Sequence, residues 1–196
     1  MADPLDRISP LLAIADPGRF GAEGEPGVGL SDRLCDSLVQ VQAWPDTIAQ
    51  TKAAIKKVTS LAVKTGFQVS SKGETVIMPT GPGRWLIESE CSDLEEVLRK
   101  AVPFKTGSVT GLTHARVVVT ISGEKTEWVL ASGIALDFAL EAFPVGTAKQ
   151  GHHHEIGLAI HRTGEKAFEF YVFTSLASAF WGWITRASAE VGYTVS

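Results

Sequence analysis

The sequence contains little cysteine: Cys35 and Cys91 are the two thiols in 196 residues. They lie in different segments and form no Cys-x-x-Cys pair, so neither a thiolate zinc site nor a redox dithiol is indicated. Two isolated thiols are typical of buried residues in a reducing cytosol. Residues 1–4 also lack the basic start of a signal peptide. We therefore expect a cytoplasmic protein with unpaired, buried cysteines.

Positive charge is not in excess either. The chain has 18 lysines and arginines against 22 aspartates and glutamates, a net charge of −4, which argues against a nucleic-acid partner. Apolar runs extend over only a few residues, so no membrane-spanning segment is predicted. The hydrophobic fraction of 44% is too high for a disordered chain, and the length suits one domain.

The first thirty residues are rich in residues that break regular structure, with four prolines and five glycines. This composition leaves no room for a long helix or a paired strand. The segment nevertheless contains apolar residues, among them Leu11 and Leu12, which a free tail usually lacks. We expect residues 1–36 to form an extended N-terminal arm. The arm lies either on a partner subunit or on the chain's own domain, and the sequence leaves both alternatives open.

Residues 37–196 show strand–helix–strand–strand–helix patterns in each half. Residues 38–43 alternate as a half-buried strand does, and Asp46 and Gly66 are expected to begin and end the helix that follows. The sequence SDLE at residues 92–95 has the form of a capping box. The pattern predicts a single α+β domain over residues 37–196, with mainly antiparallel sheet and helices on one side.

The histidine run is the most conspicuous candidate for metal binding. On a strand, His152 and His154 would share one face, and His161 could approach them. Such imidazoles suit zinc or nickel, but the spacing indicates no further ligand, so a solvated strand start is the favoured interpretation. A double variant with alanine at both positions, titrated with zinc, would separate the two interpretations.

Other candidate motifs are incomplete. The glycines at residues 27–29 and 81–83 lack the residues of a P-loop or a dinucleotide fingerprint, and the second group predicts a hairpin turn. The carboxylates Glu88, Glu90 and Glu95 suit a helix start and a solvated face better than paired-carboxylate catalysis. No Gly-x-Ser-x-Gly elbow is present. We assign no catalytic, cofactor-binding or metal-binding residue.

On the predicted last helix each residue is rotated by about 100° from the one before it, so Trp181 and Trp183 cannot both face a narrow core stripe. We expect Trp181 to be exposed as a partner contact and Trp183 to pack in the core. The alternative is a wide apolar face that covers both rings.

A set of short motifs follows in chain order: SPL at 9–11, GPGRWL at 81–86, LTHARVVVTISG at 112–123, WVLASG at 128–133, LD at 136–137, AFPVG at 142–146, HRTG at 161–164, FEFYV at 168–172 and SLASAFWGW at 175–183. In their order and spacing, these motifs resemble the gamma subunit of heterotetrameric sarcosine oxidase. The chain departs from the family pattern at Glu124 and at Ile134-Ala135, and residues 47–72 are lysine-rich and diverged. These departures leave sarcosine and another N-methyl amino acid, such as N-methylglutamate, open as the substrate of the parent complex.

The resemblance implies a fold similar to the folate-binding domain of aminomethyltransferases and a non-catalytic accessory role. The partners would be the alpha, beta and delta subunits, chiefly the large alpha subunit. Those subunits would carry FAD, FMN, NAD, zinc and tetrahydrofolate, and this chain none of them. We expect the interface to include Leu11, Leu12, Arg84, Trp85 and Trp181. A stand-alone folate-binding aminomethyltransferase-like protein is the alternative.

Overall fold

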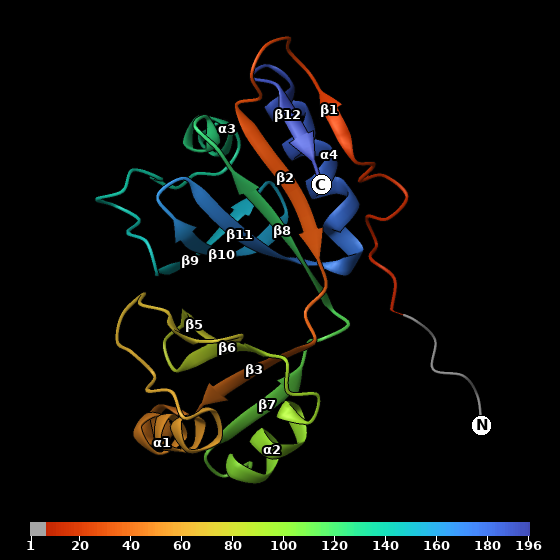
Figure 1. Cartoon of the computed structure of the whole chain (residues 1–196). Helices are drawn as coiled ribbons and strands as arrows, with labels where there is room; N and C mark the ends of the chain where they lie inside the picture. Colours follow the sequence, from red (N-terminus) through yellow and green to blue (C-terminus); the bar gives the residue numbers. More distant parts are fainter. Residues whose placement is uncertain (1–6) are drawn as a thin grey trace, which may run out of the picture.

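The computed structural model describes residues 7–196, which form two sheets stacked face to face with helices on the two outer sides (Figure 1). The prediction of an α+β fold with mainly antiparallel sheet is confirmed, and each sheet has its helices on one side. No helix among these residues combines the length and the apolar character that crossing a bilayer requires.

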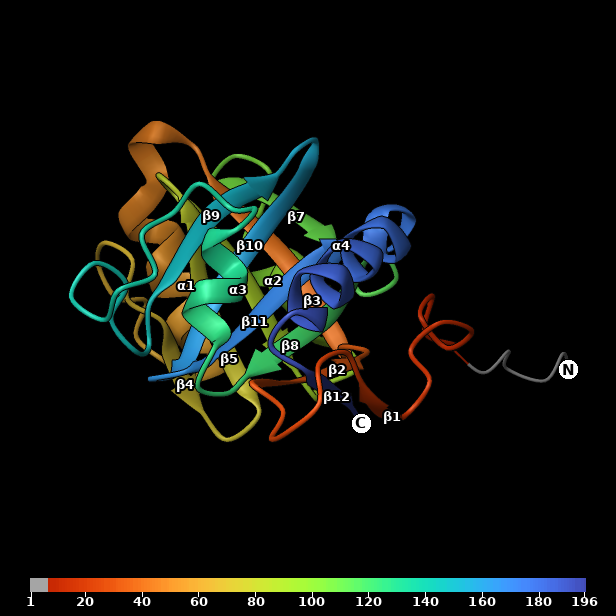
Figure 2. The same ribbon diagram turned by 90° about the horizontal axis from the view of Figure 1, so that it is seen from above.

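The large sheet has seven strands in the order β1-β12-β2-β8-β11-β10-β9. All its neighbours are antiparallel except β12 and β2. Its strands are β1 (Gly18–Phe20), β2 (Val28–Arg33), β8 (Arg116–Ser122), β9 (Ala148–His153), β10 (Ile156–Gly164), β11 (Ala167–Phe173) and β12 (Tyr193–Val195). The helices α3 (Thr126–Ala131) and α4 (Ala177–Ala189) cover it, as the view from above shows (Figure 2). A short 3-10 helix, η2 (Thr174–Leu176), precedes α4.

The small sheet has five antiparallel strands in the order β4-β5-β6-β3-β7. They are β3 (Ser37–Ala43), β4 (Ser70–Lys72), β5 (Thr75–Gly81), β6 (Arg84–Ser89) and β7 (Gly107–Gly111). The helices α1 (Ile48–Thr59) and α2 (Leu94–Ala101) lie on its outer side, and η1 (Pro45–Thr47) leads into α1. The predicted hairpin at residues 81–83 is confirmed as the β5–β6 turn.

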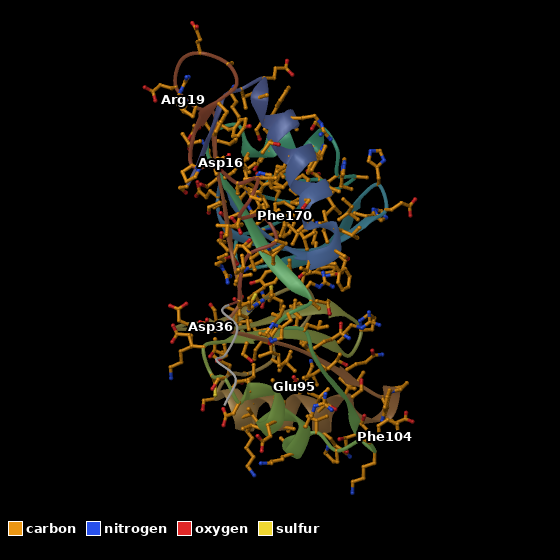
Figure 3. The ribbon with its side chains drawn as sticks, turned by 90° about the vertical axis from the view of Figure 1, so that its right-hand side faces the viewer. Asp16, Arg19, Asp36, Glu95, Phe104 and Phe170 are labelled. Carbon is orange, nitrogen blue, oxygen red and sulfur yellow. The ribbon has the colours of Figure 1, made fainter. Side chains whose placement is uncertain are left out.

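The four-layer arrangement produces three apolar cores, one under each helix layer and one between the sheets. On β8, Val117 and Val119 face α3 and α4, whereas Val118 faces the small sheet. A strand buried on both faces needs a continuous apolar run instead of alternation, which explains the run of three valines. In Figure 3, Phe170 lies among the side chains packed in the upper half, whereas Phe104 lies at the outer end of the lower half.

The N-terminal arm differs from the expectation. The prediction that its first thirty residues contain no paired strand is wrong, since β1 pairs with β12 and β2 pairs with both β12 and β8. Most of the glycines and prolines between residues 17 and 27 lie outside these strands, where they cost no ladder hydrogen bonds. From residue 7 on, the arm packs on its own domain; its residues 1–6 lie outside the described part.

Helix ends were predicted less well than helices. Asp46 lies inside η1 and makes no cap, and α1 ends at Ser60, with φ 58°, before Gly66 is reached. The capping box at residues 92–95 is wrong: Asp93 makes no side-chain cap bond to α2, and Glu95 pairs with Arg99 instead. An i, i+4 ion pair along the helix face competes with the backward reach that the box requires.

Two adjacent leucines test the packing of the arm. Leu11 is fully buried in the core under α4, whereas Leu12 is 69% exposed. Leu11→Ala removes buried methyl groups and leaves a cavity, so we expect it to lower the free energy of unfolding by about 2 to 5 kcal/mol. Leu12→Ala should change it by less than about 0.5 kcal/mol. Denaturant unfolding of the full chain measures both; equal, small effects would show that the arm does not pack on the domain in solution.

Candidate functional site

A cluster of charged and polar side chains joins the two sheets. We call it the inter-sheet cluster; it consists of Arg33, Glu88, His161, Glu169 and Tyr171. Arg33, at the end of β2, forms ion pairs with Glu88 of the small sheet and with Glu169 of the large sheet, the second at 2.9 Å. The Tyr171 hydroxyl donates to Glu88 Oε2 at 2.6 Å. A cleft of about 380 Å³ lies beside the cluster.

Burial shapes the proton affinities of this cluster. Burial by itself raises the pKa of Glu169, but the nearby His161 ring, with its Nδ1 3.5 Å from Glu169 Oε2, and the charge and hydrogen bonds of Arg33 outweigh it and lower the pKa to about 2. Burial, together with the two nearby carboxylates, raises the pKa of Tyr171. The Glu169 carboxylate is thereby held ionised against the Arg33 guanidinium. A carboxylate so engaged is a poor general base, so the cluster is suited to holding the sheets together.

A larger cavity of about 630 Å³ opens where β5 of the small sheet meets β9 of the large sheet. We call it the β5–β9 cavity. Its walls are mainly apolar and come from α1, the β5–β6 turn, the loop before β4 and the segment 136–150. Three lysines are its charged lining residues: Lys52, Lys64 and Lys149. A concave, largely apolar space with a few polar groups is the usual form of a small-molecule site.

The histidines are not arranged as predicted, although the rings of His153 and His154 are in contact, with centroids 4.5 Å apart. His154 lies in the turn after β9 with φ 47°, so the predicted shared strand face of His152 and His154 is wrong. His153 is the buried member of the run: its ring stacks on Trp183 at 4.1 Å and its Nδ1 lies 2.9 Å from the Gly133 carbonyl oxygen. His161 belongs to the inter-sheet cluster. Among residues 7–196, no group of three or more His, Cys, Asp or Glu is placed to hold a metal ion.

The carboxylates and thiols are likewise dispersed. Glu88 bonds to Arg33 between the sheets, whereas Glu95 pairs with Arg99 on α2 and Glu90 is exposed. Cys35 is buried, as expected, and burial raises the pKa of its thiol. The same expectation is wrong for Cys91, which is exposed.

The residues predicted to form an interface divide into two groups. Arg84 and Leu12 are exposed. Leu11, Trp85 and Trp181 are at most 3% exposed, so the prediction that Trp181 is open to a partner is wrong. Its ring lies under the N-terminal arm, and its Nε1 donates to the Ile14 carbonyl oxygen at 3.2 Å. The alternative of a wide apolar face is confirmed, since Trp183 is also packed against the same core.

Sequence reasoning missed two arginines, the half-buried Arg33 and the buried Arg162. Arg33 was not singled out, and Arg162 was noted only within a motif. Arg162 is 1% exposed and donates to the carbonyl oxygens of Phe138 and Phe143 at 2.6 and 2.9 Å and to Glu127 at 2.7 Å. A signal was available for Arg162, because it follows the apolar run of β10 at a position where alternation predicts an inward side chain.

The stacked-sheet α+β architecture is an aminomethyltransferase-like fold. The glycine cleavage system aminomethyltransferase T from Bartonella henselae superimposes with a TM-score of 0.55 and 17% identity, over 84% of this chain and 49% of that one. A chain of the heterotetrameric sarcosine oxidase from Corynebacterium sp. U-96, in complex with pyrrole 2-carboxylate, superimposes with a TM-score of 0.82 and 23% identity, over 94% of this chain and 96% of that one.

The sequence identifies the family. Residues 46–190 match the model of the sarcosine oxidase gamma subunit family, so the chain belongs to that family. No curated protein sequence matches it significantly.

The ion pairs of Glu169 predict a pH dependence of stability. Because the pKa of Glu169 is lowered from 4.5 to about 2 on folding, the unfolded chain takes up a proton first as the pH falls. The stabilisation is complete above about pH 5 and is lost as the pH falls towards 2. Glu169→Gln should therefore lower the Tm at pH 7 and lose this deficit near pH 2.5.

Thermal melts of both proteins between pH 7 and pH 2.5 measure the difference. Glu190→Gln, at an exposed position of the same chain, is the control and should follow the unmodified protein throughout. A Tm deficit of Glu169→Gln that stays constant over this range would contradict the assignment.

Proposed function

We propose that this chain is a non-catalytic accessory subunit of a heterotetrameric complex of the sarcosine oxidase type. The observation that carries the proposal is the family match over residues 46–190. The fold similarity to a chain of heterotetrameric sarcosine oxidase supports it, because it extends over nearly the whole of both chains.

The chemistry of the described residues supports an accessory role. A catalyst needs a nucleophile, an acid or a base that is free to react and close to a partner group. Here four ionisable groups of the inter-sheet cluster, Arg33, Glu88, Glu169 and Tyr171, are bonded to one another. The oxidative demethylation of the substrate, the transfer of its one-carbon unit to tetrahydrofolate and the cofactors FAD, FMN, NAD and zinc are then functions of the alpha, beta and delta subunits.

Two substrates fit this proposal, sarcosine and another N-methyl amino acid such as N-methylglutamate. A stand-alone aminomethyltransferase-like protein is less well supported, because this chain spans about half of the aminomethyltransferase T to which it is similar.

The exposed part of the arm is the proposed contact surface. The arm buries Leu11 and turns Ile8, Leu12 and Ile14 outward, with exposed fractions of 66, 69 and 46%. Three large apolar side chains exposed within seven residues are typical of a surface that a partner covers. Arg84, at the β5–β6 turn, is a second proposed contact: it is exposed, and the structure gives its side chain no ion pair or hydrogen bond within residues 7–196.

Purification of the tagged chain from its native cells tests the proposal. We expect the alpha, beta and delta subunits and bound flavin to co-purify with it. We also expect the purified complex to oxidise sarcosine or another N-methyl amino acid. The chain purified alone should show neither flavin absorbance nor demethylation. Stoichiometric flavin or demethylating activity in the isolated chain would contradict the accessory role, and recovery of the chain alone from native cells would contradict the complex.

Arg84→Ala tests the proposed contact. Truncating an interface anchor costs about 2 kcal/mol or more of binding, roughly thirtyfold in affinity. We expect this loss in a titration of the variant into the remaining subunits, with an unchanged Tm because the side chain is exposed. Arg99→Ala, at an exposed position of α2, is the matched control and should bind normally. Normal binding of Arg84→Ala would remove the β5–β6 turn from the interface.

A further inference from the structure

The lining of the β5–β9 cavity carries positive charge, in contrast to the chain as a whole. Its lining contains three lysines and no aspartate or glutamate, although the chain as a whole carries a net charge of −4. Lys52 comes from α1, Lys64 from the segment between α1 and β4, and Lys149 from β9. Three separate elements, belonging to both halves of the fold, thus each contribute a lysine to the lining of one cavity.

These ammonium groups retain free hydrogen-bonding capacity. Lys64 Nζ donates to the Val69 carbonyl oxygen at 2.9 Å, and Lys149 Nζ donates to the Ala142 carbonyl oxygen at 2.8 Å. An ammonium group has three donors, so each of the two keeps further N–H groups for another acceptor. Within residues 7–196 none of the three lysines forms an ion pair, and Lys52 makes no side-chain hydrogen bond. Their positive charge is therefore not neutralised by the fold.

The walls between the lysines offer flat, apolar surfaces. Trp85 lies in the lining with Lys52 Nζ 5.9 Å from its ring centroid, and Phe67 is 63% exposed at the same cavity. Pro79 and Pro82 complete this side. The Thr80 hydroxyl oxygen is buried in the lining and has no hydrogen-bond partner among the described residues. A buried polar atom without a partner is destabilising, so a bound group that bonds to it is favoured.

We propose that the β5–β9 cavity binds a small organic anion with a planar aromatic body. The carboxylate lies against the lysines, and the ring packs against Phe67, Pro79 and Pro82. The volume of about 630 Å³ is within the range of pockets for such molecules, roughly 300 to 1,000 Å³. This adds a ligand site to a subunit whose proposed role is assembly, and it does not depend on that role, because every lining residue belongs to this chain.

Calorimetric titration of the full-length chain with 2-naphthoate, an aromatic carboxylate, tests the proposal. The neutral analogue 2-naphthalenemethanol has the same ring without the charge. We expect 2-naphthoate to bind one site per chain at least about tenfold more tightly, because hydrogen bonds to charged groups contribute about 1.5 kcal/mol or more. Equal affinities would overturn the claim that the site selects an anion. Failure of both to bind would overturn the small-molecule site and leave the cavity to a partner chain.

Variants locate the bound anion. Lys52→Gln removes one charge without breaking a hydrogen bond of the fold, and we expect it to weaken 2-naphthoate binding by about tenfold. Lys57→Gln is the matched control: it is exposed on the same helix, lies outside the lining and should bind normally. Equal effects of the two variants would show that general charge, and not this cavity, attracts the anion.

A blocking variant gives a second, independent readout. Gln150 is an exposed lining residue on β9, so Gln150→Trp should fill the cavity while leaving the Tm unchanged. Loss of 2-naphthoate binding in this variant is the expected result. Undiminished binding would place the probe elsewhere on the chain and overturn the assignment. Assembly with the other subunits is scored separately by co-purification, so failure of the accessory role and failure of the ligand site are distinguishable.

Discussion

The ion pairs of Arg33 are the contact on which the stacking of the two sheets depends. Otherwise the space between the sheets is filled mainly by apolar side chains, which pack without a strong preference for one alignment. Arg33 bonds at the same time to Glu88 of β6 and to Glu169 of β11. Moving one sheet past the other would separate the largely buried carboxylates of Glu88 and Glu169 from the half-buried Arg33, which is destabilising. The cluster therefore selects one alignment of the sheets, and the position of every surface and cavity follows from that alignment.

Stacking two sheets leaves their outer faces to be covered. Helices cover most of each face, but a wide aromatic surface on α4 extends beyond a single stripe, and the N-terminal arm completes the cover over Trp181. The arm has apolar side chains on both of its sides. It can bury Leu11 inward only by turning Leu12 outward. The exposed apolar residues proposed as a contact surface are thus a consequence of how the arm closes the core.

The strands, turns and helices that depend on the pattern of neighbouring residues were the features best predicted from the sequence. The strand at 38–43, the turn at 81–83 and the helix that starts near residues 92–95 all follow from local patterns, and all are present. Apart from the helix ends, the turn at His154 and the exposed Cys91, the errors concern residues whose surroundings come from far along the chain. Trp181 is covered by Ile14, 167 positions away, and Arg33 meets Glu169 across 136 positions. No periodicity encodes such contacts. The fold family was predicted from the motif resemblance, because those motifs are distributed over the whole chain and do not depend on any one local pattern.

The walls of the β5–β9 cavity come from the small sheet and from the segment that leads into β9. That segment has little regular structure, yet it is held in place: Arg162 donates to the carbonyl oxygens of Phe138 and Phe143, and Lys149 donates to that of Ala142. A buried arginine without these acceptors would carry an unsatisfied charge, so the segment and the arginine hold each other in place. A cavity wall fixed in this way loses little conformational entropy when a ligand binds. The entropic cost of ordering the protein therefore reduces the affinity for the ligand only slightly. The cavity is consequently preformed in the folded chain, before any other subunit is added.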